Sequence, residues 1–300
     1  MIRIGVDFGG TKIEAAALDS NGTFVARKRG PNPGNYRASI QSIADLVAAV
    51  ERQAGTRMAS VGVGAPGSIS PRTGRMRNAN SVWLNDRPFL PDLQEALGRP
   101  VRLENDANCF ALSEAVDGAA RGARVVFGAI LGTGCGGGIV VDGRTVEGRN
   151  RIGGEWGHTP LPWPSVGENG AHHCWCGREG CLETWISGSA FCADYAAASA
   201  RVVDGETVVA AARAGDAEAI KALDRYVDRL GRALAVVCDV IDPDIIVVGG
   251  GMSNTAELYD RVPAAIERRV FSDTFTTPVA PAMHGDSSGV RGAAWLWPLE

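Results

Sequence analysis

The chain has 300 residues, of which 45% are hydrophobic and 21% charged, and its formal net charge is −4. These proportions are typical of a globular protein with a large core and exclude a disordered or collagen-like chain. No apolar run approaches about 18 residues, and residues 1–8 lack the apolar core of a signal peptide, so neither a membrane span nor export is expected. The seven cysteines, an odd number, then argue against a disulfide framework and predict a reducing compartment, the cytoplasm.

The first part of the chain is predicted to form strands, a hairpin and two helices. The apolar run Ile2–Asp7 ends at two glycines, and Asn21-Gly22 is typical of a tight turn between paired strands. Between Tyr36 and Ala54, apolar residues recur at spacings of three and four, which predicts one buried helix face. The elements expected here are strands at Ile2–Asp7, Lys12–Leu18, Thr23–Lys28, Val61–Ala65 and Val101–Leu103, and helices at Tyr36–Ala54 and Ala107–Val116.

The second part repeats the order of strand, glycine-rich turn and strand before a series of helices. The turn is expected at Gly132–Gly138, and the spacing of apolar residues predicts a long helix over Asp216–Ile241. This repetition predicts a duplicated α/β unit with a cleft between the halves. The elements expected here are strands at Val125–Leu131, Ile139–Asp142 and Ile245–Val248, and helices at about 189–200, 206–214, Asp216–Ile241, Asn254–Arg269 and Asp286–Trp297.

Three glycine-rich turns follow predicted strands and point to a nucleotide. They lie at Asp7–Lys12, Leu131–Gly134 and Val248–Gly251. Glycine allows backbone N–H groups to approach a phosphate, because no Cβ stands in the way. The chain has no lysine directly after a glycine, as a P-loop requires, and no G-x-G-x-x-G opens a helix after the first strand. A tight structural turn remains the alternative for each one taken alone.

Two aspartates are candidates for phosphoryl-transfer chemistry. Asp7 stands beside the first glycine turn, where a carboxylate serves a Mg²⁺ directly or through water, or else caps the turn. Asp106 lies between a predicted strand and a predicted helix, where a base for a substrate hydroxyl can face a cleft. The alternative is that Asn105 or Asp106 caps the helix, and both roles can hold at once.

A group of His and Cys residues predicts a metal site. His158, Cys174, Cys176 and Cys181 have the pattern H-x15-C-x-C-x4-C. Three thiolates and one imidazole close a tetrahedral Zn²⁺ site, which indicates a structural ion. His172 and His173 are rival ligands, and three unrelated buried cysteines are the alternative. The other cysteines, expected to be inert core residues, are Cys109, Cys135, Cys192 and Cys238.

Five motifs along the chain resemble those of the ROK (repressor, open reading frame, kinase) family of sugar kinases. They are Asp7–Lys12 (DFGGTK), Glu104–Cys109 (ENDANC), Gly132–Gly134 (GTG), Gly154–His158 (GEWGH) and Cys174–Glu183 (CWCGREGCLE). The resemblance covers essentially the whole chain. Within the family, Gly67–Pro71, Asn78–Leu84 and His284–Pro298 look most like bacterial fructokinases that also accept mannose.

The resemblance implies a ribonuclease H-like, hexokinase/actin-type fold of two α/β domains around a central cleft. Residues 1–117 and 286–300 would form the N-terminal domain, and 118–285 the C-terminal domain with a zinc-binding loop at 158–181. Asp106 matches the catalytic base. The matches to sugar-binding residues are Asn80, Asn105, Asp106, Glu155, His158 and Glu183. The matches to nucleotide-binding residues are Asp7, Gly9, Gly10, Thr11, Lys12, Gly132, Thr133, Gly134, Gly249, Gly250 and Gly251.

The expected function is an ATP- and Mg²⁺-dependent hexose kinase that phosphorylates the 6-hydroxyl, with fructose as the expected substrate and mannose as a second one. N-acetylglucosamine, N-acetylmannosamine and glucose are alternative substrates. A sugar-responsive repressor is the alternative from another class, but a DNA-binding helix-turn-helix is not expected before a strand that begins at Ile2. A sugar-binding module without activity is a third reading. The expected partners are the sugar, ATP and a second copy of the chain in a homodimer, without nucleic acid or membrane.

Overall fold

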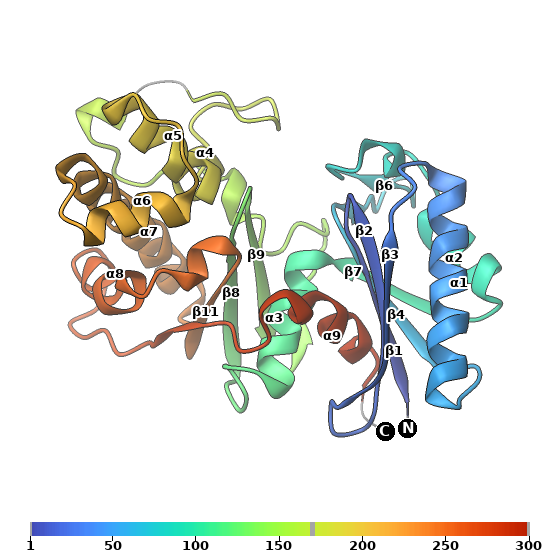
Figure 1. Ribbon diagram of the computed structural model, residues 1–300. Coiled ribbons are helices and arrows are strands. Elements are labelled where there is room, and N and C mark those ends of the chain that lie inside the picture. Colours follow the sequence, from blue (N-terminus) through green and yellow to red (C-terminus); the bar gives the residue numbers. More distant parts are fainter. Residues whose placement is uncertain (1, 169–171, 299–300) are drawn as a thin grey trace. The chain divides into compact units, whose positions relative to one another are not determined.

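The computed structural model describes residues 2–168 and 172–298 (Figure 1). Its contacts divide the chain into two compact units. Unit 1 consists of Met1–Gly122, Gly138–Gly154 and Asp286–Glu300, and unit 2 of Ala123–Gly137 and Glu155–Gly285. Residues 118–122 and 138–154 were expected in the second domain, and their place in unit 1 corrects that boundary. The reason is close packing within unit 1, where a Cβ on Gly138 would lie 2.3 Å from the carbonyl oxygen of Ala107.

Unit 1 is built on a five-stranded sheet with the order β3-β2-β1-β4-β7. Its strands are β1 (Arg3–Phe8), β2 (Lys12–Leu18), β3 (Phe24–Pro31), β4 (Ser60–Ala65) and β7 (Val101–Asn105). The hairpin strands β2 and β3 are antiparallel to their neighbours, whereas β1, β4 and β7 are parallel. The carboxyl ends of β1, β4 and β7 therefore lie at one edge of the sheet.

Helices cover both faces of this sheet (Figure 1). Helices α1 (Tyr36–Ala54) and α2 (Phe89–Leu97) pack on one face, and α3 (Asp106–Asp117) and α9 (Ser288–Trp295) lie on the other. The apolar residues spaced by three and four in α1 are buried against the strands, as the sequence predicted. Helix α2 was not predicted. Its Pro91 lies in the first turn, where a backbone N–H has no helical partner to lose.

The backbone of α9 touches the sheet directly. A Cβ on Gly5 in β1 would lie 1.8 Å from the carbonyl oxygen of Val290, and a Cβ on Gly62 in β4 would lie 1.8 Å from that of Ala293. Real Cβ atoms do not approach an oxygen so closely, so glycine is required at both positions. The two glycines thus allow α9, which begins at Ser288, to pack its backbone directly on a sheet whose first strand begins at Arg3.

Short elements complete unit 1. The hairpin β5 (Ser68–Ile69) and β6 (Met76–Arg77) precedes the 3₁₀ helix Val82–Leu84. Val140 and Val141 of β9 (Cys135–Val141) pair with Thr145 and Arg144 of β10 (Arg144–Thr145). The expected turn at Gly132–Gly138 is thus wrong in length, because the strand begins at Cys135 and only residues 132–134 turn. Gly136–Gly138 are strand residues, and Gly138 is required for the contact with α3 described above.

Unit 2 has parallel strands with helices that follow in sequence. Strand β8 (Val125–Leu131) pairs with β11 (Ile245–Gly249), which pairs with β12 (Val279–Pro281). The first residues of β9 lie beside β8. The helices are α4 (Glu183–Ile186), α5 (Gly188–Ser199), α6 (Gly205–Arg213), α7 (Ala217–Ile241) and α8 (Glu257–Glu267), with 3₁₀ turns at Trp156–His158, Val166–Glu168 and Gly251–Asn254. A further 3₁₀ turn, Gly285–Ser287, leads into α9.

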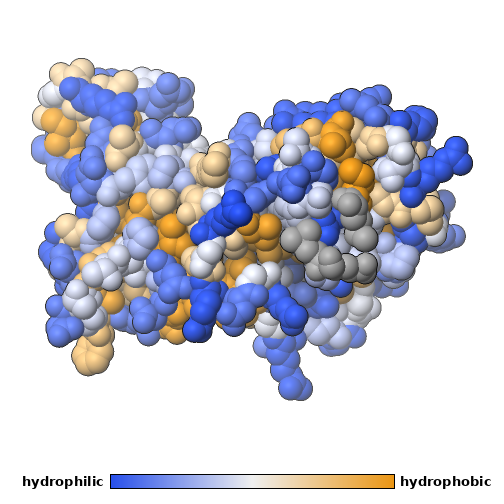
Figure 2. Space-filling view, turned by 90° about the horizontal axis from the view of Figure 1, so that it is seen from below, coloured by the Kyte–Doolittle hydropathy of each residue, from blue (hydrophilic) through white to orange (hydrophobic). Residues whose placement is uncertain are grey.

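The long helix α7 agrees with its prediction within one residue. Asp216 caps it by accepting a hydrogen bond from the N–H of Ala219, and residues such as Leu223, Leu230 and Leu234 are buried along one face. None of the described helices is long and apolar enough to cross a membrane. On the face shown in Figure 2, hydrophobic patches lie among hydrophilic side chains.

Substituting Gly5 tests the contact between α9 and the sheet. We expect Gly5→Ala to lower the free energy of unfolding by about 3 kcal/mol or more, because the new methyl group must displace backbone rather than a flexible side chain. Gly30→Ala in β3 is the matched control, since its Cβ would meet Leu46 at an ordinary 3.9 Å. Urea unfolding of both variants measures the difference. Equal unfolding midpoints would show that the contact is not a constraint.

Candidate functional site

The edge of unit 1 at which the parallel strands end carries three acidic residues. Asp7 in β1 is in register with Gly64 in β4, which is in register with Glu104 in β7, and Asp106 begins α3 directly after β7. Burial, followed by repulsion from Glu104, Asp106 and Asp7, raises the pKa of the Cys109 thiol. All three carboxylates therefore lie near one side chain of α3. The structure thus brings together Asp7 and Asp106, which the sequence placed in different motifs.

Asp7 has an unusual environment for an aspartate. Burial, with repulsion from Glu14, raises the pKa of Asp7 to about 6, although Lys12 and Arg29 oppose the shift. The first turn of α9 leaves room for the carboxylate, because a Cβ on Gly289 would lie 3.1 Å from Asp7 Cγ. A carboxyl with such a pKa is partly protonated near neutral pH, and a bound cation would stabilise its ionised form.

The first glycine turn, Gly9–Thr11, is held by a residue that the sequence did not single out. Asn32 donates from Nδ2 to the carbonyl oxygen of Gly9 at 2.7 Å and from its backbone N–H to that of Thr11 at 2.9 Å. The N–H of Gly9 donates to the carbonyl oxygen of Lys12 at 3.0 Å. The turn is therefore fixed by carbonyl contacts on one side, while Gly10 and Thr11 are exposed.

The start of α3 fixes the proposed base segment. Asn105 is the N-cap, and its Oδ1 accepts from the N–H of Ala107 at 2.9 Å while its Nδ2 donates to the carbonyl oxygen of Gly67 at 3.2 Å. Oδ1 of Asp106 accepts from the same N–H at 2.8 Å. The capping alternative is thus correct for Asn105, and Asp106 is oriented by the same helix end.

Glu104 is a further residue at this edge, and the sequence analysis did not assign it a role. Burial raises the pKa of Glu104. Its Oε1 accepts from the N–H of Asn105 at 2.7 Å and from Nδ2 of Asn108 at 3.1 Å, and its Oε2 accepts from Oγ1 of Thr145 at 3.3 Å. Its place beside Asn105 was the one available signal, but Thr145 is distant in the sequence. Glu104 therefore positions the strand end from which Asn105 and Asp106 project.

Asn80, the remaining predicted sugar contact of unit 1, is exposed in the loop before the 3₁₀ helix Val82–Leu84. Asn85 holds this loop, since its Oδ1 accepts from the N–H of Ala79 and its Nδ2 donates to the carbonyl oxygen of Ala79, both at 3.0 Å.

In unit 2 the other two glycine turns lie against each other. Turn Gly132–Gly134 follows β8 and turn Gly249–Gly251 ends the neighbouring parallel strand β11. A Cβ on Gly250, whose φ is +79°, would lie 2.6 Å from the carbonyl oxygen of Leu131. The N–H of Gly188, at the start of α5, donates to the carbonyl oxygen of Gly132 at 2.7 Å. Two turns and one helix N-terminus therefore meet, an arrangement that suits a phosphate.

The four predicted metal ligands of unit 2 converge. The ligand atoms of His158, Cys174, Cys176 and Cys181 all lie within 4.8 Å of one another. Cys174 Sγ is 3.6 Å from His158 Nδ1, and Cys176 Sγ is 3.7 Å from Cys181 Sγ. Bonds of about 2.3 Å to a tetrahedral zinc ion place two sulfur atoms at about this separation. The donor set and its spacing thus fit a closed zinc site.

The loops and the rival histidines agree with this assignment. Gly177 and Gly180 have φ values of +85° and +69°, which glycine adopts without strain, and they turn the chain between the cysteines. The ring of His172 lies tilted against that of Trp185 with centroids 4.2 Å apart, and Nδ1 of His173 lies 3.5 Å from Glu179. Both rival side chains thus have other neighbours.

Cys135 contacts Glu183 and the turn that carries His158. The N–H of Cys135 donates to Oε2 of Glu183 at 2.9 Å, and a Cβ on Gly157 would lie 2.0 Å from the carbonyl oxygen of Cys135. Gly157 lies in the 3₁₀ turn that carries His158 and follows Glu155. Trp156 anchors this turn, because its Nε1 donates to the carbonyl oxygen of Gly136 at 2.8 Å. The segment after β8 therefore contacts Glu183 directly and holds the turn Trp156–His158.

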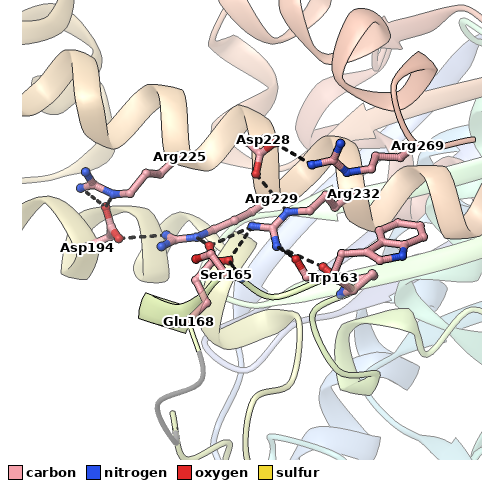
Figure 3. Close-up of polar contacts among 10 residues, drawn as sticks. Trp163, Ser165, Glu168, Asp194, Arg225, Asp228, Arg229, Arg232 and Arg269 are labelled. Atoms are coloured by element: carbon pink, nitrogen blue, oxygen red, sulfur yellow. Dashed lines mark hydrogen bonds and ion pairs between the residues drawn. The ribbon is translucent and has the colours of Figure 1, made fainter.

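A buried charge network holds residues 162–168 against the helices (Figure 3). Glu168 accepts from Arg229 at 2.7 Å and from Arg232 at 2.8 Å, and Asp194 in α5 accepts from Arg229 at 2.9 Å. Burial would raise the pKa of Glu168, but hydrogen bonds from Arg229, from the N–H of Ser165 and from Arg232 hold it at about 2. Removing one partner would leave an uncompensated buried charge. Residues 162–168 are thereby fixed on α7.

Similarity to known proteins extends over nearly the whole chain. The family model described as ROK family matches residues 3–300. The chain is 40% identical over 297 residues to an N-acetyl-D-glucosamine kinase of Pectobacterium atrosepticum, covering 97% of each chain. It is 38% identical over 300 residues to one of Vibrio parahaemolyticus, covering 97% of this chain and 98% of the relative.

Solved structures have the same fold. The ROK hexokinase from Thermus thermophilus matches with a TM-score of 0.87 and 34% identity, covering 98% of this chain and 97% of that one. The ROK family glucokinase from Streptomyces griseus, solved with glucose and AMPPNP, matches with a TM-score of 0.80 and 29% identity over 99% of each chain.

The environment of Asp7 predicts that replacing this residue raises the free energy of unfolding by an amount that depends on pH. The folded protein binds a proton at Asp7 with a pKa of about 6 instead of 3.8, so ionisation opposes folding as the pH rises through this range. We expect ligand-free Asp7→Asn to be more stable than wild type at pH 7.5, by about 2 to 3 kcal/mol, and by less than about 1 kcal/mol at pH 4. Urea unfolding at several pH values measures this. A difference that does not change with pH would contradict it.

Proposed function

Because the chain belongs to the ROK family, we propose that it is an ATP-dependent sugar kinase whose substrate is N-acetyl-D-glucosamine, phosphorylated at the 6-hydroxyl. The observation that carries the proposal is the full-length similarity to relatives named N-acetyl-D-glucosamine kinase. The meeting of two glycine turns at one strand edge supports the nucleotide part of the proposal.

Fructose, the substrate expected from the sequence, is not supported, because these relatives carry another name. The expectation came from three short stretches, Gly67–Pro71, Asn78–Leu84 and His284–Pro298. One group on a substrate is worth only about 1–3 kcal/mol in a pocket, so a few side chains decide between hexoses. Short motifs outside those side chains therefore identify the family better than the sugar.

In the proposed mechanism, Asp106 accepts the proton of the sugar hydroxyl as the hydroxyl oxygen attacks the γ-phosphoryl group of ATP. Its place at the start of α3 supports this role, because Ala107 orients one of its oxygens. Mg²⁺ would neutralise charge on the phosphates, with Asp7 as its proposed partner. The proposed phosphate contacts are the turns Gly9–Lys12, Gly132–Gly134 and Gly249–Gly251.

The proposed sugar contacts are those that the resemblance implies. They are Asn80, Asn105, Asp106, Glu155, His158 and Glu183. A zinc ion held by Nδ1 of His158 and the three thiolates would fix the imidazole, so that Nε2 can bond a hydroxyl. Such a site needs reduced cysteines, and the chain has no disulfide among its seven. We therefore also propose a reducing compartment such as the cytoplasm. The homodimer stays a prediction.

A panel of sugars tests the substrate. We expect kcat/KM for N-acetyl-D-glucosamine to exceed that for glucose, N-acetyl-D-mannosamine, mannose and fructose by about tenfold or more, since pocket contacts discriminate on this scale. A coupled assay of ADP release measures each sugar under the same conditions. A higher kcat/KM for fructose or mannose would contradict the proposal and restore the fructokinase interpretation.

Replacing the proposed base tests the mechanism. We expect Asp106→Asn to lower kcat by about 10²–10⁴-fold with an unchanged circular dichroism spectrum, because a positioned base contributes on this scale. Asp45→Asn is the control, since Asp45 is exposed on α1 and bonds only a neighbouring glutamine in its described contacts. A loss of less than about tenfold in Asp106→Asn would show that another group takes the proton.

A further inference from the structure

The carboxylate of Glu183 joins two segments of unit 2 that the proposed function treats separately. Its Oε1 accepts a hydrogen bond from Nε1 of Trp175 at 2.6 Å, and its Oε2 accepts one from the N–H of Cys135 at 2.9 Å. Trp175 lies in the segment of the metal ligands, and Cys135 directly follows the turn Gly132–Gly134. One side chain therefore connects the Cys/His cluster to a proposed phosphate turn.

On the metal side, Trp175 is closely tied to the ligands. It stands between Cys174 and Cys176 in the chain, and its ring meets that of His158 edge to face, with centroids 5.1 Å apart. Although 62% of Trp175 is exposed, its indole N–H is directed to a carboxylate rather than to solvent. A hydrogen bond to a charged acceptor is roughly twice as strong as a neutral one. Trp175 lies between two proposed metal ligands, so its orientation depends on the segment that a bound metal would hold.

On the phosphate side, the carboxylate touches the turn itself. A Cβ on Gly134 would lie 2.6 Å from Oε2 of Glu183, so glycine leaves the space that the carboxylate fills. The N–H of Gly132 donates to the carbonyl oxygen of Gly134 at 3.0 Å, and the carbonyl oxygen of Gly132 accepts from Gly188. Glu183 is therefore one of the contacts that hold the backbone of this small turn.

We propose that Trp175 is a positioning residue that acts through Glu183 to couple the Cys/His cluster to the turn Gly132–Gly134. A metal in the cluster and a nucleotide at the turn then strengthen each other's binding. This inference rests on the proposed function, because it needs a nucleotide at that turn. Coupling between two sites is reciprocal, so each ligand changes the affinity of the other by the same factor.

Equilibrium binding measures this coupling without catalysis. Zinc affinity is determined by competition with a chromophoric chelator, with and without saturating AMP-PNP and Mg²⁺, and AMP-PNP affinity by calorimetry, all in the absence of sugar. In the wild type we expect AMP-PNP to raise zinc affinity about fivefold or more, the lower end of typical coupling between sites. Kinetics with varied ATP should show a higher KM for ATP in Trp175→Phe than in wild type.

Trp175→Phe keeps an aromatic ring beside His158 and removes the donor to Glu183. We expect this variant to bind AMP-PNP about fivefold more weakly and to lose the effect of AMP-PNP on zinc. Trp163→Phe is the matched control, because Trp163 is also exposed in unit 2 but contacts Arg232 through its backbone carbonyl. The control should retain the coupling of the wild type.

The outcomes separate this inference from the proposed function. If AMP-PNP binds the wild type but leaves zinc affinity unchanged, the coupling is wrong and the kinase proposal stands. Full coupling in Trp175→Phe would show that Trp175 is not the link. If AMP-PNP fails to bind the zinc-loaded wild type at all, the proposed function is wrong and the inference falls with it. The zinc affinity of the wild type with and without AMP-PNP tests the coupling even if Trp175→Phe does not fold.

Discussion

Direct contact between backbones is the constraint on which both units depend. In unit 1, Gly5 and Gly62 allow α9 to rest on the strands, and a Cβ on Gly292 would lie 1.7 Å from the carbonyl oxygen of Cys109 in α3. In unit 2, a Cβ on Gly157 would lie 2.0 Å from the carbonyl oxygen of Cys135, and a Cβ on Gly250 would lie 2.6 Å from that of Leu131. Because neither partner can yield without moving a whole element, such contacts fix the register of elements more firmly than side chains do. Many of the 39 glycines thus serve packing rather than flexibility.

Glutamates join these packed elements to the candidate site. Glu104 holds the end of β7, Glu183 holds the end of the turn after β8, and Glu168 holds the segment before the cysteines on α7. Each of these carboxylates accepts hydrogen bonds from more than one donor. At least one donor to each carboxylate is distant from it in the sequence. The segments that carry the proposed catalytic and binding residues are thereby held by glutamates that are themselves hydrogen-bonded.

Local patterns predicted the local features well. The spacing of apolar residues located α1 and α7, and residue type with spacing selected the four members of the Cys/His cluster. Helix α2 was missed because prolines obscure its start, and Gly136–Gly138 were assigned to a turn because glycine is ambiguous between turns and close packing. In these cases the deciding neighbour, such as Ala107 for Gly138, is not visible in the local sequence.

The parts of the site that depend on long-range pairs were not predictable in the same way. Nothing around Asn32 indicates that it holds Gly9 and Thr11, and nothing around Glu104 indicates Thr145. The motifs identified the family, but choice among hexoses depends on a few side chains with small energy differences. The substrate expectation was therefore the part of the sequence interpretation that the relatives did not support.

The place of α9 in the chain has a consequence for how the protein is made. Strands β1 and β4 leave the ribosome long before α9, so the sheet face that α9 shares with α3 lacks α9 throughout synthesis of unit 2. Every residue of unit 2 precedes Asp286, so unit 2 can finish folding while unit 1 still waits for its last helix. This order reverses the usual sequence of domain folding during translation. The packing of β1 and β4 is therefore completed only when residues 288–295 have been made.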